Sequence, residues 1–222
     1  MFNGEEATAD LGSRYDLTRL VFKKYPSCAL TAGSTDTMLR LIREEDITPE
    51  DVERIDVTVP PYTHKLVGHA FEVGENPKVN AQFNIRYCVA NALLRKSSRL
   101  FHFEEDQIKD PRIAALTKKI NVTADKALEA RGHTPLDMRV KMRSGREFVR
   151  KLDIAPGFPG NALTQHDHEQ RFRDCVDFGG KLISGKNAES IVALVDEIEK
   201  IEDIRMLIPL LLRQEGIQEG TV

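Results

Sequence analysis

The sequence has 222 residues, of which 41% are hydrophobic and 30% charged, and its formal net charge is −3. This length allows one large domain with a buried core. We expect no nucleic-acid partner, because the lysines and arginines form no patch the size of a nucleic-acid groove. We also expect no membrane partner, because the longest apolar run, residues 206–212, contains Pro209 and is too short to cross a bilayer.

The cysteines are three in number, far apart and without a C-x-x-C pair. This pattern argues against both a disulfide framework and a zinc site. The first twelve residues, MFNGEEATADLG, are acidic and polar and do not resemble a secretory signal. We therefore expect a cytoplasmic location, where thiols stay reduced.

The first half of the chain opens with residues 1–20, which show little periodicity and are expected to form a lead-in or linker. Apolar residues at helical spacing predict a helix over residues 34–44, with Ser34 or Thr35 as its N-cap. Alternating apolar residues then predict a strand over residues 54–59, which a pair of prolines ends.

A longer helix is predicted over residues 79–95, where the apolar residues form a stripe that includes Tyr87. Two short helices are expected after it. The second begins at Pro111, with Asp110 as its cap.

The period of the pattern changes in the second half. The segments INVTAD, LDMRVKM and EFVRKLDIA alternate apolar and polar residues and predict strands, the last two joined as a hairpin by RSGR. Helices are predicted from Thr164 to about Lys181, over residues 188–200 and over residues 204–213. This order is not a strict βαβ alternation, so the fold class is α+β. We expect residues 21–160 to form the α+β domain and residues 161–222 to be C-terminal helices that pack on it or on a helical partner.

The residues before the first helix are candidates for a binding site. Lys23 and Lys24 can bind a carboxylate as point charges. Cys28 stands near these cations and near a predicted helix start, a setting that lowers the pKa of a thiol. From residue types alone, surface lysines and a packed cysteine are the simpler explanation of the same residues.

Tyr87 lies on the apolar stripe of the long helix, which indicates a core position. A buried tyrosine hydroxyl still needs a hydrogen-bond partner, and Tyr87 can therefore point at a pocket whose edge Arg86 also reaches. The H-D-H run at residues 166–168 does not predict a metal site, because side chains two apart on a helix face different ways.

Several segments, taken in this order, resemble the C-terminal part of the MmgE/PrpD family. They are FKKYPSC, IDVTVP, NPKVNAQFNIRYCVANALL, DPRIAALTKKINVTAD, MRVKMRSGREFVRKLDIAPGFPGNALT and EQRFRDC. The resemblance as a whole runs from about residue 12 to residue 180. This family includes 2-methylcitrate dehydratases, cis-aconitate decarboxylases and iminodisuccinate epimerases.

The resemblance implies a two-domain protein with a large all-helical domain and a smaller α+β domain. It implies a homodimer that needs no metal or organic cofactor, with an active site between the domains that performs acid–base chemistry on small di- and tricarboxylates. We expect the helical N-terminal domain to be absent here, because the chain has about half the family's usual length. The uncovered domain should then expose an apolar patch, around residues 204–212 or near Tyr87.

The resemblance also assigns roles to individual residues. Lys23 matches a lysine that lines the site and would bind a substrate carboxylate. Tyr87 matches a pocket tyrosine that would hydrogen-bond the substrate or donate a proton, and Cys28 falls where some members have a catalytic histidine. The sequence departs from the family at Ala29 and Ala32, where many members have an arginine and a histidine.

We therefore expect the C-terminal half of a cofactor-independent MmgE/PrpD-like lyase, similar to the 2-methylcitrate dehydratases of propionate metabolism, whose site is completed by a helical partner subunit. One alternative is a non-catalytic dimerisation or interaction module, or an inactive remnant. Another alternative, within enzymes, is an epimerase or isomerase of an amino-dicarboxylate.

Overall fold

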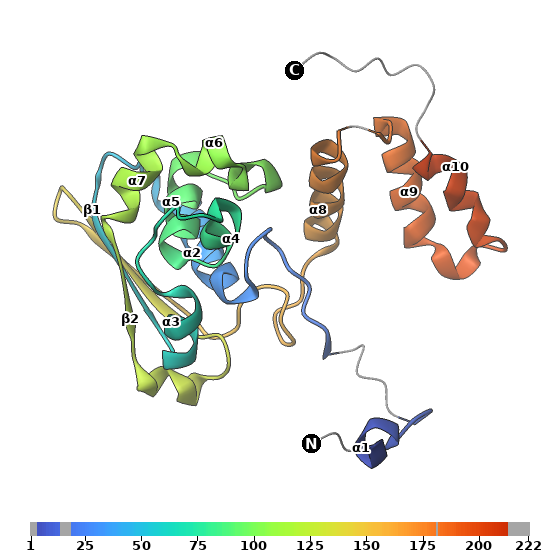
Figure 1. The fold of residues 1–222 in the computed structure, drawn as a ribbon, viewed down its shortest axis with the longest axis horizontal. Coiled ribbons are helices and arrows are strands. Elements are labelled where there is room, and N and C mark those ends of the chain that lie inside the picture. Colours follow the sequence, from blue (N-terminus) through green and yellow to red (C-terminus); the bar gives the residue numbers. More distant parts are fainter. Residues whose placement is uncertain (1–3, 14–18, 181, 213–222) are drawn as a thin grey trace.

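The computed structural model describes residues 4–13, 19–180 and 182–212 (Figure 1). A sheet at one side is covered by helices on its inner face, and together they form the body of the molecule. The C-terminal helices follow the body as a separate arm, in which α8 lies next to the body and α9 and α10 lie beyond it. Within these segments, no helix is both long and apolar enough to cross a bilayer.

The sheet has four strands in the order β2-β1-β3-β4. The central strand β1, Val52–Val59, pairs in parallel with β2, Ile120–Ala124, and antiparallel with β3, Leu136–Met142. β3 continues through a tight turn into β4, Glu147–Leu152. The predicted strands and hairpin are confirmed, and the mixed sheet with packed helices confirms the α+β fold class.

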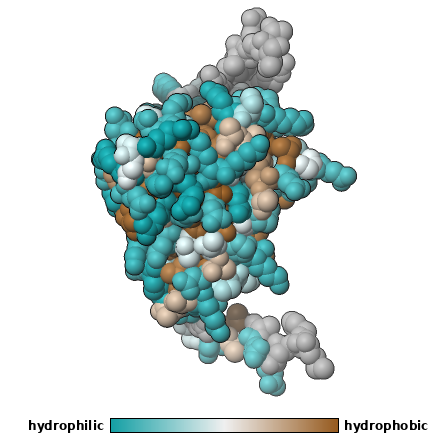
Figure 2. All heavy atoms as spheres, turned by 90° about the vertical axis from the view of Figure 1, so that its left-hand side faces the viewer, coloured by the Kyte–Doolittle hydropathy of each residue, from teal (hydrophilic) through white to brown (hydrophobic). Residues whose placement is uncertain are grey.

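Only one face of the sheet is buried. Ile55 and Val57 of β1 and Val140 of β3 point inward and are fully buried. Charged residues among those that alternate with them form ion pairs on the outer face, where Arg139 of β3 pairs with Glu147 of β4 at 2.7 Å. Figure 2 shows this side of the molecule as largely hydrophilic. Within the described residues, the outer face of the sheet is therefore solvent-exposed and is not covered by a second layer of helices.

The inner layer is built on two helices, α2 at Ala29–Glu45 and α5 at Ile85–Arg95, which pack on each other. The prediction that this first helix begins at Ser34 or Thr35 is wrong, because α2 begins at Ala29. Both hydroxyls donate to the backbone carbonyl of Thr31 inside the helix, at 2.9 and 3.0 Å. Ser and Thr satisfy the backbone in either place, which is why the sequence alone misplaced the start.

The single helix predicted over residues 79–95 is also wrong. The structure has α4 at Pro77–Gln82 and then α5, with Phe83 and Asn84 between them. The Asn84 side chain accepts a hydrogen bond from the Tyr87 backbone N–H at 3.1 Å and so caps α5. The apolar stripe continues across the break, and periodicity therefore concealed it.

Short elements complete the body. They are α3 at Pro61–Val67, η2 at Leu100–Phe103, α6 at Glu105–Ile108, α7 at Pro111–Thr117 and η3 at Lys126–Arg131. The predicted cap of α7 is confirmed, because the Asp110 side chain accepts from the Arg112 backbone N–H at 2.8 Å.

The arm begins with α8, Gln165–Phe178, whose first turn is closed by a reciprocal capping box between Thr164 and Asp167. The predicted start of this helix is confirmed, while its predicted end, Lys181, lies outside the described residues. The elements after α8 are α9 at Gly185–Asp196, η4 at Ile198–Lys200, η5 at Ile204–Leu207 and α10 at Ile208–Leu211. At the other end of the chain, α1 at Gly4–Thr8 stands apart from the body.

The arm exposes large apolar side chains. More than half of the surface of Ile204, Met206, Ile208, Leu211 and Leu212 is accessible. The patch expected around residues 204–212 is thus confirmed, whereas Tyr87 is fully buried and marks no exposed patch.

Candidate active-site groove

The segment that carries Lys23 is attached to the body on two sides. The backbone N–H of Phe22 donates to the carbonyl of Gly157 at 3.0 Å. At the other end, the Gln82 side chain donates to the carbonyl of Pro26 at 2.9 Å. An extended segment that is held at both ends presents its side chains at fixed positions.

Lys24 joins this segment to both α2 and α8. Its ammonium lies 3.1 Å from a carboxylate oxygen of Asp36 and 3.1 Å from one of Asp167. The Tyr25 hydroxyl donates to the same Asp36 oxygen at 2.7 Å. Burial, reinforced by the Asp36 charge, raises the pKa of Tyr25 far above its ordinary value, so the phenol stays protonated and remains a donor.

A groove separates α8 from this segment and from the loop after α5. It consists of two adjoining cavities of about 180 and 350 Å³. We call it the α8 groove. Its lining residues are Lys23, Lys24, Tyr25, Pro26, Leu39, Arg43, Lys96, Ser97, Ser98, Arg99, Leu100, His166, Asp167, Gln170, Arg171, Asp174 and Cys175.

The α8 groove has an excess of positive charge. Its two carboxylates are already paired, Asp167 with Lys24 at 3.1 Å and Asp174 with Arg99 at 3.0 Å. The lining cations that have no carboxylate partner among the described residues are Lys23, Arg43, Lys96 and Arg171. A hollow with this balance attracts and concentrates small anions.

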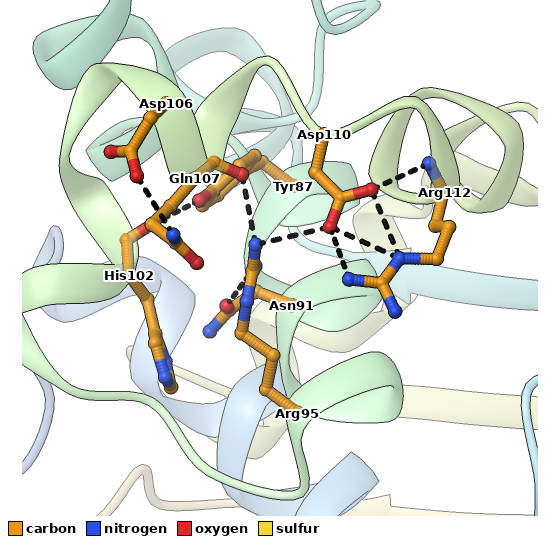
Figure 3. A network of polar contacts seen from close by, with 8 residues as sticks. All are labelled: Tyr87, Asn91, Arg95, His102, Asp106, Gln107, Asp110 and Arg112. Atoms are coloured by element: carbon orange, nitrogen blue, oxygen red, sulfur yellow. Dashed lines mark hydrogen bonds and ion pairs between the residues drawn. The ribbon is translucent and has the colours of Figure 1, made fainter.

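One wall of the groove is formed by the loop after α5 and the start of η2, residues 96–101. Arg95 anchors this loop at its start (Figure 3). Its guanidinium donates to the Asn91 side chain at 2.7 Å and to the Gln107 carbonyl at 2.9 Å, and it lies 3.7 Å from Asp110. The next residue, Lys96, turns the chain out of α5 with a left-handed backbone, φ +54°. The loop therefore leaves the helix in a defined direction.

Tyr87 and His102 support the same loop from its buried side. The Tyr87 hydroxyl donates to the backbone carbonyl of His102 (Figure 3). His102 Nδ1 in turn accepts the backbone N–H of Arg99 at 3.2 Å. Burial raises the pKa of Tyr87, and burial together with the charges of Arg95 and Arg99 lowers the pKa of His102 to about 4. Both side chains are thus neutral and support the wall of the groove.

The structure brings only one of the four site residues predicted from the sequence to this groove. Lys23 lines it, whereas Tyr87 lies in the core beneath it. Cys28 is half-buried just before α2, packs against the core and is not among the lining residues. The exposed cysteine on the groove is Cys175 of α8.

Arg86 has a different environment from the pocket edge predicted for it. Its Nε donates to the carbonyl of Ile120 at 3.1 Å, and its Nη1 donates to the carbonyls of Gly68 and His69. Burial lowers its pKa. The guanidinium thus joins α5 to β2 and to the loop after α3, which is a structural arrangement.

Replacing Arg86 with methionine is therefore expected to lower the free energy of unfolding by about 2 kcal/mol, because partly buried carbonyls lose a charged donor. Urea denaturation measures this change. Arg54→Met is the matched control, since Arg54 pairs with Asp56 on the exposed sheet face at 2.8 Å and should change stability by less than about 1 kcal/mol. Equal effects of the two substitutions would contradict the structural role.

Sequence reasoning missed Ser98, Lys96 and Arg171. They lie in a polar loop and on a charged helix, where single residues carry no pattern, and only folding places them opposite Lys23. Within the described part of the chain, no group of three or more His, Cys, Asp or Glu residues is arranged to hold a metal ion.

Residues 25–204 match the MmgE/PrpD C-terminal domain, and the chain belongs to this family. It is similar to cis-aconitate decarboxylase of Homo sapiens, with 25% identity over 202 residues, and to that of Mus musculus, with 24% identity over 210 residues. Each alignment covers 88% of this chain and 40% of the relative. The chain thus spans about two fifths of the length of the curated relatives it matches. The resemblance inferred from the sequence segments is confirmed.

Proposed function

We propose that this chain is the C-terminal half of a cofactor-independent MmgE/PrpD-type lyase that acts on small di- or tricarboxylates. The observation that carries the proposal is the α8 groove, where four cations have no carboxylate partner among the described residues. Family membership supports the reaction class, and the similarity to cis-aconitate decarboxylases makes cis-aconitate the first substrate to test. 2-Methylcitrate is the second, as expected for a dehydratase-like member.

In this proposal, Lys23 binds one carboxylate of the substrate as a point charge. Loss of carbon dioxide or water also requires groups that move protons. His166, which lines the groove, is a residue type suited to that task. Tyr87 and Cys28 do not contact the substrate in this proposal. Tyr87 supports the wall of the groove through its hydrogen bond to His102, and Cys28 packs against the core.

The remaining catalytic groups come from a helical partner subunit in this proposal. The exposed apolar side chains of residues 204–212 support such a partner, because a surface of this kind is normally covered. The complete enzyme is a cytoplasmic homodimer of such assemblies, and the three free cysteines are consistent with that compartment.

A non-catalytic interaction module is the second candidate. It is favoured by Ala29 and Ala32 in the first turns of α2, which cannot bind a carboxylate or transfer a proton. The two proposals separate in a single experiment. The chain is purified from its native cells with whatever protein it binds, and the mixture is assayed on cis-aconitate and 2-methylcitrate. Absence of turnover of both acids would favour the module.

Within an active assembly, Lys23→Ala is expected to raise KM about tenfold, because a substrate carboxylate loses a charged partner. Steady-state kinetics measures this change. Lys65→Ala is the matched control, since Lys65 is exposed on α3 and is not among the residues that line the groove. If KM and kcat are both unchanged in Lys23→Ala, this lysine does not bind substrate.

A further inference from the structure

Ser98 has an unusual environment in the wall of the α8 groove. Its hydroxyl oxygen is buried and, within the described part of the chain, is the only such side-chain atom without a hydrogen-bond partner. The residue is 9% exposed and lines both cavities of the groove. A buried hydroxyl without a partner is destabilising, and folded proteins rarely retain one without a reason.

The neighbours of Ser98 indicate what it could bind. Arg171 of α8 lines the same two cavities, is only partly exposed and has no hydrogen bond or ion pair with a described residue. Lys96 lies two residues before Ser98 and also lacks a carboxylate partner. A hydroxyl, a guanidinium and an ammonium are all donors, and the ligand that satisfies them together is an anion.

We propose that the α8 groove contains a specific subsite for one carboxylate of a small polycarboxylate, formed by the Ser98 hydroxyl and the Arg171 guanidinium, with Lys96 adding charge. The choice of a polycarboxylate over other anions rests on the proposed function. A planar guanidinium binds a carboxylate through two parallel hydrogen bonds. In this proposal, rotation of Ser98 about its one side-chain torsion, between staggered positions, brings the buried hydroxyl to the ligand.

The geometry of the groove favours a ligand with several carboxylates over a single small ion. The larger cavity, about 350 Å³, has the size of pockets that hold small molecules. Lys23 and Arg171 both line the smaller cavity. A second carboxylate can therefore bind at Lys23 while the first occupies the Ser98–Arg171 subsite. Ser98 and Arg171 thus make the groove select ligands with more than one carboxylate.

The first experiment is calorimetric titration of the full chain with citrate, and with inorganic phosphate in a parallel arm. Ser98→Ala is expected to weaken citrate binding about fivefold and Arg171→Gln about tenfold. The matched controls are Ser190→Ala and Arg173→Gln. In the unmodified chain, the Ser190 hydroxyl donates to the Lys186 carbonyl on α9, and Arg173 pairs with Glu189. Both controls should bind citrate like the unmodified chain.

Equal citrate affinity in all five proteins would overturn the subsite. Phosphate binding as tight as citrate binding would overturn the assignment to a polycarboxylate. A catalytically silent mixture that binds citrate through Ser98 and Arg171 would sink the proposed function and keep the subsite. If the mixture turns over substrate but Ser98→Ala and Arg171→Gln bind citrate like the unmodified chain, the proposed function stands and the subsite is overturned.

Thermal unfolding without ligand distinguishes binding from a structural role. If Ser98 serves a ligand, Ser98→Ala should leave the melting temperature of the ligand-free chain unchanged or raised, because an unpaired hydroxyl is removed. The same variant should gain less stability from added citrate than the unmodified chain. A clear fall in the melting temperature without ligand would show that Ser98 serves the fold, and would overturn the proposal.

Discussion

Gly157→Ala is expected to lower the free energy of unfolding by about 4 kcal/mol, or to release the segment that carries Lys23 from the body. Gly157 has a positive φ, +85°, which strains any other residue by about 1–3 kcal/mol. A Cβ at this position would lie 1.8 Å from the backbone oxygen of Phe22. Relief of that overlap adds about 1–3 kcal/mol and breaks the hydrogen bond from the Phe22 N–H to the Gly157 carbonyl.

Gly145→Ala provides a matched control. Gly145, in the turn of the β3–β4 hairpin, has nearly the same φ, +86°, but nothing lies within 4 Å of a Cβ built there. The difference between the two variants therefore isolates the contact with Phe22. Urea denaturation measures stability, and limited proteolysis near residue 22 reports release of the segment. Equal results for the two glycines would show that the attachment at Phe22 does not hold the segment in place.

This attachment connects the fold to the groove. Lys23 directly follows Phe22, and its position depends on a loop more than a hundred residues further along the chain. The next residue, Lys24, forms ion pairs with Asp36 of α2 and Asp167 of α8. Citrate binding should therefore weaken in Gly157→Ala even though no residue of the groove is changed.

Local patterns predicted the sheet well. Each strand alternates inward and outward residues, and β1 repeats this pattern against both of its neighbours. The cap of α7 was equally clear, because Asp110 before Pro111 satisfies one orphan N–H and the proline needs none. These features depend on residues that are close in sequence, which is why they can be read before folding.

The residues of the groove could not be predicted from local sequence patterns in the same way. The sequence predicts a pocket at Tyr87 because a buried hydroxyl needs a polar partner, and it adds Arg86 because this residue is the neighbour of Tyr87. In the structure both side chains have polar partners elsewhere. Those partners are backbone carbonyls of His102, Gly68, His69 and Ile120, which have no sequence signature. Ser98 is the opposite case, an ordinary serine in sequence whose missing partner becomes visible only in the folded chain.

His102 should make the stability of the protein depend on pH. Burial and the nearby charges of Arg95 and Arg99 lower its pKa from 6.5 to about 4 in the folded chain. Between pH 6.5 and pH 4, the unfolded chain therefore binds a proton that the folded chain does not bind. Stability from this residue is fully present above pH 6.5 and decreases as the pH falls, by up to about 3 kcal/mol at pH 4.

His102→Asn tests this dependence, because asparagine carries no titrating group and keeps an oxygen that can accept the Arg99 N–H. We expect the loss of stability between pH 7 and pH 4.5 to be smaller in this variant than in the unmodified chain by about 2 kcal/mol. Urea denaturation at the two pH values measures it, and His133→Asn, the same exchange at an exposed histidine, is the control. If His102→Asn and the unmodified chain lose stability equally, the ring is already solvated. Its Nδ1 would then not hold Arg99, and the wall of the groove would lack the support that places Ser98 opposite Arg171.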